Sequence, residues 1–410
     1  MYAIMTLVLS LVGCGGSGEG GDAARREARR PDPAIGGADS APDVGIGPGA
    51  DTGGSALPET QEAELRGIWV TRWSWDSPEE IEAIMADVAA SGFNTVFFQV
   101  RGTFDAFYDS GVEPWAMRLT GTLGRNPGWD PLQTAIDAGH VQGLDVHAYI
   151  NTFPLWQGTI PPGPAEPSHA LTDHPEWLVA DGSGTPQALN DSYVFASPGN
   201  PAVRARVRAV AADITRNYAV DGVHLDYIRY PGAQYSHDPV SEARWAMDGG
   251  DRADWQRAQV VATAAGVSEA VDVPVTAAVW GVHTNGFGWR AVSEGAVDYY
   301  QDSFAFLEAG AVDANIPMLY WPVAEEEGSR LDFRVLVRDH VSNRHGRHVY
   351  AGAGGESVDF EQLQGCIEVA RQEGAQGVVV FDYNLYASDL IRLRDDAFAI
   401  DAVPPAMPWR

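Results

Sequence analysis

Lysine is absent from this chain of 410 residues, so all 27 of its Lys and Arg positions are arginines, against 56 Asp and Glu residues. The formal net charge at pH 7 is −29. A surface that binds the phosphate backbone of a nucleic acid needs a positive excess. The composition therefore predicts that nucleic acid is not a partner, and a soluble acidic surface accounts for the charge.

The signatures of several enzyme classes are also missing. No G-x-S-x-G nucleophile elbow occurs, and no His-x-His pair opens the first expected strand, as it commonly does in metal-dependent barrel hydrolases. His345 and His348 lie three residues apart, but they precede an expected strand. In a barrel, the segments that precede the strands mainly stabilise the fold, so this pair is not expected to bind a catalytic metal. We expect no metal and no cofactor.

Cysteine is scarce, with only Cys14 and Cys366. Residues 1–14 (MYAIMTLVLSLVGC) form an apolar stretch too short to span a bilayer, typical of a signal peptide. The ending L-V-G-C resembles a bacterial lipoprotein signal, with Cys14 as the lipidated residue and a lipid anchor in the membrane. No basic residue precedes the stretch, and an accidental apolar N-terminus is the alternative. We expect a cell-envelope lipoprotein, on the outer membrane or the periplasmic face in a Gram-negative bacterium. Cys366 is expected to be a buried core residue.

The composition divides the chain into four segments. Residues 1–14 are the expected lipoprotein signal peptide, and residues 15–62 are rich in Gly, Ala, Pro and Asp. Such a segment cannot bury enough apolar surface to fold, so it is predicted to be a disordered tether. Residues 63–400 are the expected folded domain and residues 401–410 a C-terminal tail.

From Glu64 onward, patterns typical of strands and helices alternate. Ser77 and Asn200 are predicted N-caps, and Val203, Val207, Val210 and Ile214 share one helical face. The predicted strands lie at residues 65–71, 94–100, 144–150, within 221–231, and at 273–280, 314–321, 348–354 and 376–383. The fold class is therefore α/β: a single (β/α)8 TIM barrel with long βα loops, preceded by the tether. An open doubly wound sheet would need a glycine fingerprint after its first strand, and none occurs.

Aromatic residues are numerous in the segments that follow the strands, and the whole chain contains 13 Trp. In a TIM barrel these βα loops build the active site. Aromatics gathered on one rim beside polar groups favour a sugar ligand, although packing of a large fold is the alternative. The aromatics in question include Trp73, Trp75, Phe104, Phe107, Tyr108, Trp115, Phe153, Trp156, Trp177 and Phe195.

Asp226, in the stretch DGVHLDYIRYP (221–231), is the best candidate for a catalytic carboxylate. It shares a strand face with His224 and lies near the strand end, where a barrel directs side chains to the catalytic mouth. The alternative is a structural Asp bonded to Arg229, Arg101 or a backbone amide. Glycoside hydrolysis needs a second carboxylate, and the candidates are Asp105, Asp302, Glu356 and Asp382. Glu356 is favoured, because an acidic residue across the mouth would face Asp226.

A series of motifs, in order, resembles a known family over Glu64 to about residue 400: RGIWVT, GFNTVFFQVRG, EPWA, GWDPL, GLDVHAYINTFP, HPEWLV, PGNPAVR, DGVHLDYIRYP, the QD of YYQDSF, and NIPMLYW. They are similar to those of the bacterial glycosyl hydrolase-like 10 family. The resemblance implies a TIM barrel, often on an exported lipoprotein. It also implies a substrate, because a relative in this family acts on peptidoglycan glycan strands stripped of their stem peptides. It supports Asp226 as a site residue without fixing its partner.

A second likeness, to the D-G-x-D-x-D-x-E strand of chitinase-like enzymes, fails at the decisive position. Asp226 matches, but His224 replaces an Asp and Ile228 replaces the catalytic Glu. A chitinase-type mechanism would lack its acid.

The leading hypothesis is a lipid-anchored glycoside hydrolase that acts on a cell-wall or related polysaccharide. The same residues would also suit a non-catalytic glycan-binding barrel, or a lytic transglycosylase or lyase on the same polymer. The expected substrate-binding residues are Arg101, Asp105, His147, Asn151, His224, Arg229, Tyr230, Trp280, Tyr320 and Trp321.

Overall fold

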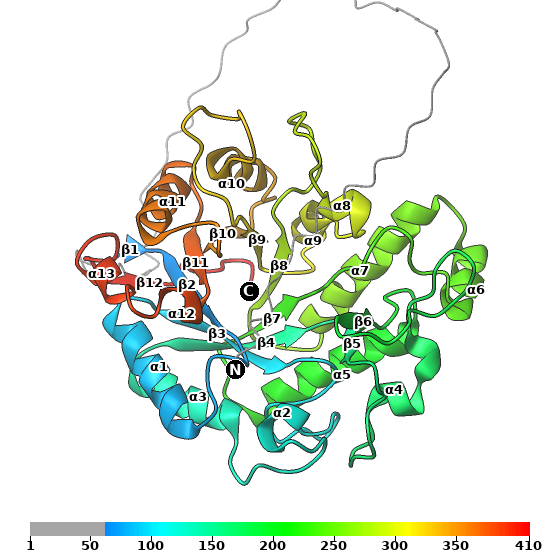
Figure 1. The fold of residues 1–410 in the computed structure, drawn as a ribbon. Helices are drawn as coiled ribbons and strands as arrows, with labels where there is room; N and C mark the ends of the chain where they lie inside the picture. Colours follow the sequence, from blue (N-terminus) through cyan, green and yellow to red (C-terminus); the bar gives the residue numbers. More distant parts are fainter. Residues whose placement is uncertain (1–61) are drawn as a thin grey trace, which may run out of the picture. The chain divides into compact units, whose positions relative to one another are not determined.

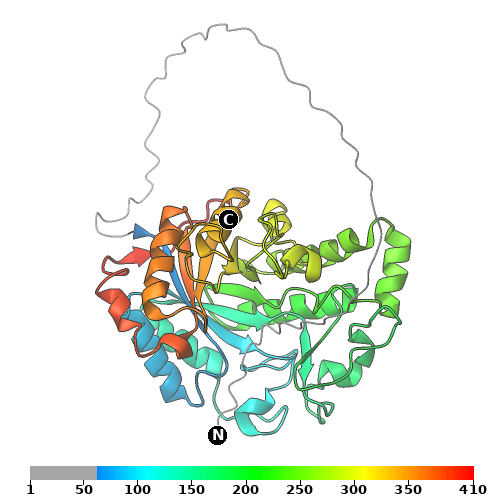
Figure 2. The same cartoon turned by 45° about the horizontal axis from the view of Figure 1, so that its top comes forward.

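The computed structural model describes residues 62–410, which form a closed barrel of eight strands (Figure 1). All neighbouring pairs are parallel. The first and last barrel strands, β2 and β11, pair directly and close the sheet (Figure 2). In ring order the strands are β10 (His348–Gly354), β11 (Gly377–Phe381), β2 (Leu65–Val70), β3 (Thr95–Arg101), β4 (Asp145–Asn151), β7 (Gly222–Asp226), β8 (Val275–Trp280) and β9 (Ala314–Met318). The predicted (β/α)8 barrel is confirmed.

Helices surround the barrel, as the predicted alternation requires (Figure 1). Ser77 and Asn200 are confirmed as N-caps, since their side chains accept hydrogen bonds from Glu80 N and Ala202 N. The helices are α1 (Pro78–Ala90), α2 (Met117–Thr120), α3 (Pro131–Val141), α4 (Ala170–Asp173), the 3-10 turn η1 (Pro175–Trp177), α5 (Pro201–Asn217), α6 (Pro239–Asp248), α7 (Arg252–Ser268), α8 (Gly295–Asp298), α9 (Ser303–Glu308), α10 (Phe333–Ser342), α11 (Phe360–Gln372), α12 (Tyr383–Tyr386) and α13 (Ile391–Arg394).

The core has two parts, because strand side chains alternate between the barrel interior and the helix layer. The outer part includes the predicted stripe of α5, whose four apolar residues are all buried. The inner part fills the barrel with mostly large side chains: Leu65, Trp69, Phe97, Tyr149, Ala278, Ala314, Ile316, Tyr350 and Val379. The barrel is therefore a packed core, and chemistry is confined to its ends.

Two small sheets lie outside the barrel. In the long connection after β4, β5 (Pro154–Gln157) pairs antiparallel with β6 (Tyr193–Phe195). At the other end, β1 (Glu62–Ala63) pairs with β12 (Ala402–Val403), so part of the predicted tail 401–410 is bound to the barrel. The tail continues to Trp409 and Arg410, which donate hydrogen bonds to Asp313, directly before β9.

No helix within residues 62–410 has the length and apolar character needed to cross a bilayer. The predicted signal peptide, Cys14 and nearly all of the predicted tether lie outside the described residues. Cys366 is fully buried, as predicted, and burial raises the pKa of its thiol to about 12.

Candidate active site

Asp226 is the last residue of β7 and lies at the C-terminal end of the barrel, with 8% of its surface exposed. Its carboxylate accepts a hydrogen bond from the Tyr149 hydroxyl at 2.7 Å and one from the backbone N–H of Tyr227. The Arg229 guanidinium lies 3.6 Å from the same carboxylate. Two contacts of the structural alternative, to Arg229 and to a backbone amide, are therefore present.

Two buried donors beside Asp226 have no hydrogen-bond acceptor within the described part of the chain: Asn151 Nδ2 and Arg229 Nη1. Asn151 is the register partner of Asp226 in the adjacent strand, and its Oδ1 accepts from Gln99. A buried donor without a partner is costly. A sugar hydroxyl would supply the missing acceptor.

Aromatic rings enclose the Arg229 guanidinium. It lies 4.4 Å from the ring centre of Tyr227 and 5.4 Å from that of Trp280. The Trp280 indole is held in place, because its N–H donates to the Ser293 carbonyl at 2.8 Å. This arrangement fixes the cation without engaging all of its donors.

Tyr320 lies near two carboxylates at this end of the barrel. Its ring stacks on Phe381, with centroids 5.0 Å apart. Burial, and then the charges of Asp226 and Asp382, raise the pKa of the Tyr320 hydroxyl well above its ordinary value. Tyr320 therefore stays protonated near both acids and can donate a hydrogen bond.

The four candidates for the second carboxylate have different surroundings. Glu356 is exposed on the loop after β10. Asp105 accepts a hydrogen bond from the Thr103 N–H at 2.7 Å. Asp302 caps α9 and pairs with His283 at 3.0 Å. Burial raises the pKa of Asp302, but its hydrogen bonds with His283 and the Ala305 N–H outweigh burial, so the pKa is lowered overall. Asp382 directly follows β11, with 7% of its surface exposed.

Arg101, expected to bind substrate, is fully enclosed. Its guanidinium forms a bidentate ion pair with Glu113 at 2.7 and 2.8 Å. It also donates to the carbonyls of Asn151 and Thr152. These contacts fix the end of β4 beside Asp226, so Arg101 acts as a positioning residue in this structure, and substrate contact stays a prediction.

The two histidines lie inside the barrel rather than at its mouth. His224 is fully buried, and its Nε2 accepts a hydrogen bond from the Trp69 indole N–H at 3.0 Å. The proton of the neutral ring is therefore on Nδ1, which donates to the Thr276 hydroxyl. His147 packs against Gly222, and burial lowers the pKa of His147 to about 4. Neither has open access to a ligand. Within residues 62–410, no group of three or more His, Cys, Asp or Glu side chains is arranged to hold a metal ion.

Most of the loop aromatics named in the sequence analysis are buried and pack the fold, which is the alternative interpretation of their number. Tyr230 is fully buried with its ring edge-on to Tyr300, and Trp321 packs beside Gly281. Trp73 is the clear exception at 51% exposed, flanked by Arg72 and Arg118. The aromatics that are buried instead are Trp75, Phe104, Phe107, Tyr108, Trp115, Phe153, Trp156, Trp177 and Phe195.

Tyr149, which holds Asp226, is the main site residue absent from the sequence predictions. Burial and the Asp226 charge raise the pKa of its hydroxyl well above the usual range, so it remains a donor. A signal was available, because Tyr149 shares a strand face with His147 and Asn151, both of which were predicted.

At the opposite end of the barrel, the carboxyl group of Asp145 has a raised pKa. Burial, and then the charge of Asp221, raise the pKa of Asp145 to about 6. The folded-state pKa lies above the unfolded value, so ionisation of Asp145 destabilises the fold as pH rises from about 4 to about 6. A raised pKa alone therefore does not identify a catalytic residue.

We expect Asp145→Asn to stabilise the protein by about 1–2 kcal/mol at pH 7.5, after allowance for partial exposure. Near pH 3.5 the gain should vanish, because the wild-type carboxyl is then protonated in both states. Urea unfolding at the two pH values measures the difference, with exposed Asp272→Asn as the control. Equal stability of variant and wild type at pH 7.5 would contradict the prediction.

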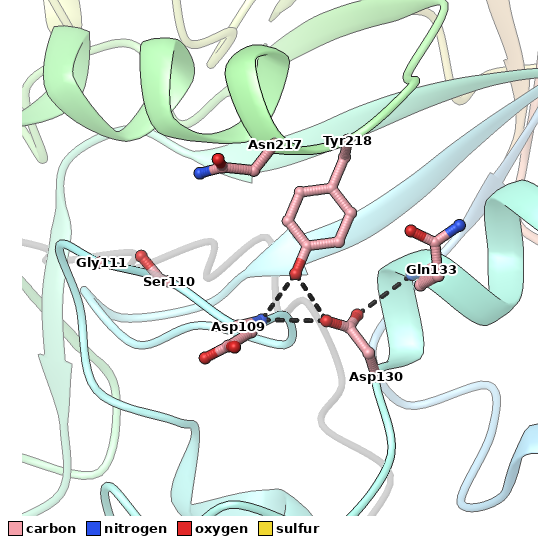
Figure 3. Close-up of a pocket in the computed structure, with 7 residues that line it drawn as sticks. All are labelled: Asp109, Ser110, Gly111, Asp130, Gln133, Asn217 and Tyr218. Atoms are coloured by element: carbon pink, nitrogen blue, oxygen red, sulfur yellow. Dashed lines mark hydrogen bonds between the residues drawn. The ribbon is translucent and has the colours of Figure 1, made fainter.

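A pocket outside the barrel interior is lined by none of the predicted site residues (Figure 3). The Tyr218 hydroxyl donates to Asp130 and accepts from the Asp109 N–H, and the Gln133 N–H donates to the other oxygen of Asp130. These polar groups satisfy one another and join the loop after β3 to α3 and the end of α5. The lining residues are Asp109, Ser110, Gly111, Asp130, Gln133, Asn217 and Tyr218.

The barrel carries carboxylates at the C-terminal ends of its strands, the position and residue type that glycoside hydrolases of this fold use. The model of one family, glycosyl hydrolase-like 10, matches residues 64–364, and the chain belongs to this family. Two similar relatives are glycosyl hydrolase YngK of Bacillus subtilis and glycosyl hydrolase DigH of Escherichia coli K12. The first is 24% identical over 85% of this chain and 74% of its own length. The second is 29% identical over 68% of this chain and 70% of its own length.

Solved structures share the fold at low sequence identity. The glycoside hydrolase domain of PgaB (BpsB) from Bordetella bronchiseptica aligns with a TM-score of 0.59 at 15% identity, over 81% of this chain and 98% of that one. The catalytic domain of β-amylase from Paenibacillus polymyxa aligns with a TM-score of 0.54 at 12% identity, over 81% and 94%. These likenesses establish the barrel fold and do not identify a substrate.

Proposed function

We propose that this protein is an exported, lipid-anchored glycoside hydrolase that cleaves cell-wall polysaccharide, with the glycan strands of peptidoglycan as its substrate and Asp226 as one catalytic carboxylate. The observation that carries the proposal is the setting of Asp226. Its carboxylate is held by Tyr149 at the C-terminal end of β7, beside Asn151 Nδ2 and Arg229 Nη1, two donors that have no hydrogen-bond acceptor within residues 62–410. A hydroxyl-rich ligand meets the needs of both donors.

The choice of polymer rests on the family and on the N-terminal motif. Export and anchoring through Cys14 would place the enzyme in the cell envelope, where this polymer lies. Fractionation of cells that express wild type or Cys14→Ser tests the anchor, since the variant should leave the membrane fraction.

A substrate panel tests the reaction. Purified protein is incubated with denuded glycan strands, intact peptidoglycan and neutral polysaccharides, and reducing ends and product masses are measured. Hydrolysis adds one water per bond cleaved, whereas a lyase or lytic transglycosylase leaves an unsaturated or anhydro end. Reducing ends from the denuded strands, with hydrated masses, are the expected result. Binding without any product would favour the glycan-binding alternative instead.

A further inference from the structure

Asp382 stands opposite Asp226 in the barrel. Three strands separate β11 from β7 in either direction around the ring, β2, β3 and β4 on one side and β8, β9 and β10 on the other. Asp382 directly follows β11, as Asp226 ends β7, so both lie at the C-terminal end of the barrel. A glycosidic bond must be flanked by its two carboxylates, and opposite strands allow this.

The surroundings of the two acids differ in kind. Asp226 meets a guanidinium and a hydroxyl donor, contacts that suit a carboxylate anion. Asp382 has no ion pair with any residue of 62–410, and it accepts only from backbone N–H groups at the start of α12, including Leu385 at 3.2 Å. Burial raises the pKa of Asp382 to about 6, against the effect of those backbone donors. Such a difference, one acid beside a cation and a hydroxyl donor and the other buried without a cation, is the kind of arrangement that assigns two carboxyl groups to different roles.

Tyr320 lies near both acids. Its ring stacks on Phe381, the residue before Asp382, and after burial the charges of both carboxylates raise the pKa of its hydroxyl. The rivals lack this connection. Asp302 is engaged with His283, Asp105 with the Thr103 amide, and Glu356 is exposed.

We infer that Asp382 is the general acid that acts together with Asp226, a conclusion that rests on the proposed glycosidase function. Asp382 lies beyond the residues matched by the family model, so the geometry carries the assignment. The Asp382 carboxyl gives its proton to the glycosidic oxygen while the bond from that oxygen to the anomeric carbon breaks and its electrons stay on the leaving oxygen. Asp226 acts as nucleophile or base. Over the cycle one water is consumed: its hydroxyl ends on the anomeric carbon, and its proton restores the carboxylate pair.

The test is the pH profile of kcat/KM on denuded glycan strands, measured for wild type, Asp382→Asn and Asp382→Ser. Asn and Ser both retain N-cap capacity for α12, so folding is preserved while the acid is lost. Asp359→Asn is the matched control, because Asp359 caps α11 in the same way after β10. Glu356→Gln tests the rival acid, and thermal melting confirms that each variant is folded.

Wild-type kcat/KM should fall about tenfold per pH unit above roughly pH 6, as the acid loses its proton. Both Asp382 variants should lose about 10²-fold or more and should lack this limb of the profile. A fall no greater than that of Asp359→Asn, or a limb that survives in the Asp382 variants, overturns the inference alone. Loss of activity in Glu356→Gln but not in the Asp382 variants overturns it in favour of Glu356. If wild type cleaves no glycan, the proposed function fails, and the inference with it.

Discussion

Asp226→Asn should lower kcat/KM on denuded glycan strands by about 10³-fold or more, equivalent to roughly 4 kcal/mol of transition-state stabilisation. Whether Asp226 serves as nucleophile or base, the amide can neither bond to the anomeric carbon as a carboxylate does nor take a proton from water. The amide also turns an N–H₂ group toward Arg229 or the Tyr227 N–H, both donors. We therefore expect a modest loss of stability as well. Release of reducing ends under saturating and limiting substrate separates kcat from KM.

Tyr149→Phe is the matched control for this result. It removes one hydrogen bond to the same carboxylate but leaves the acid itself, so we expect about a tenfold loss, typical of roughly 1.4 kcal/mol. A structural role for Asp226 predicts a different pattern, in which activity follows thermal stability in both variants. Activity of folded Asp226→Asn within tenfold of wild type would remove Asp226 from the chemistry.

The barrel was predictable because its strands are buried on both faces and appear as continuous apolar runs. The predicted run 348–354 coincides with β10, and the others agree with their strands to within a few residues at most ends. Caps such as Ser77 and Asn200 are local signals, and they were found where expected. Asp226 could be placed because its position depends only on the strand that it ends.

The rest of the site depends on how long loops fold back, and no local signal encodes that. Phe104 and Trp73 both follow strands, yet one is fully buried and the other half exposed. Sequence spacing likewise gave no reason to prefer Asp382 over Glu356. Their difference lies in burial and in the contact network around Tyr320, which exist only in the folded barrel.

Arg101→Met should cost about 3–5 kcal/mol of folding stability, the second large effect that we expect. It leaves the Glu113 carboxylate buried without a cation, since both partners of the pair are at most 1% exposed. It also removes the donor to the carbonyls of Asn151 and Thr152. Urea unfolding of the isolated variant measures the cost.

The double variant Arg101→Met, Glu113→Leu separates these two contributions. Replacing a buried ion pair by apolar side chains is often close to neutral, so the double variant should regain the part of the stability that the single variant loses through the unpaired Glu113 carboxylate. It should still lack the donor to the carbonyls of Asn151 and Thr152, each worth about 1–3 kcal/mol if left unpaired. Because Arg101 holds the end of β4 beside Asp226 through those carbonyls, the double variant should remain less active than wild type even where it is folded. A stable double variant with full activity would show that Arg101 serves only the ion pair and does not position the site.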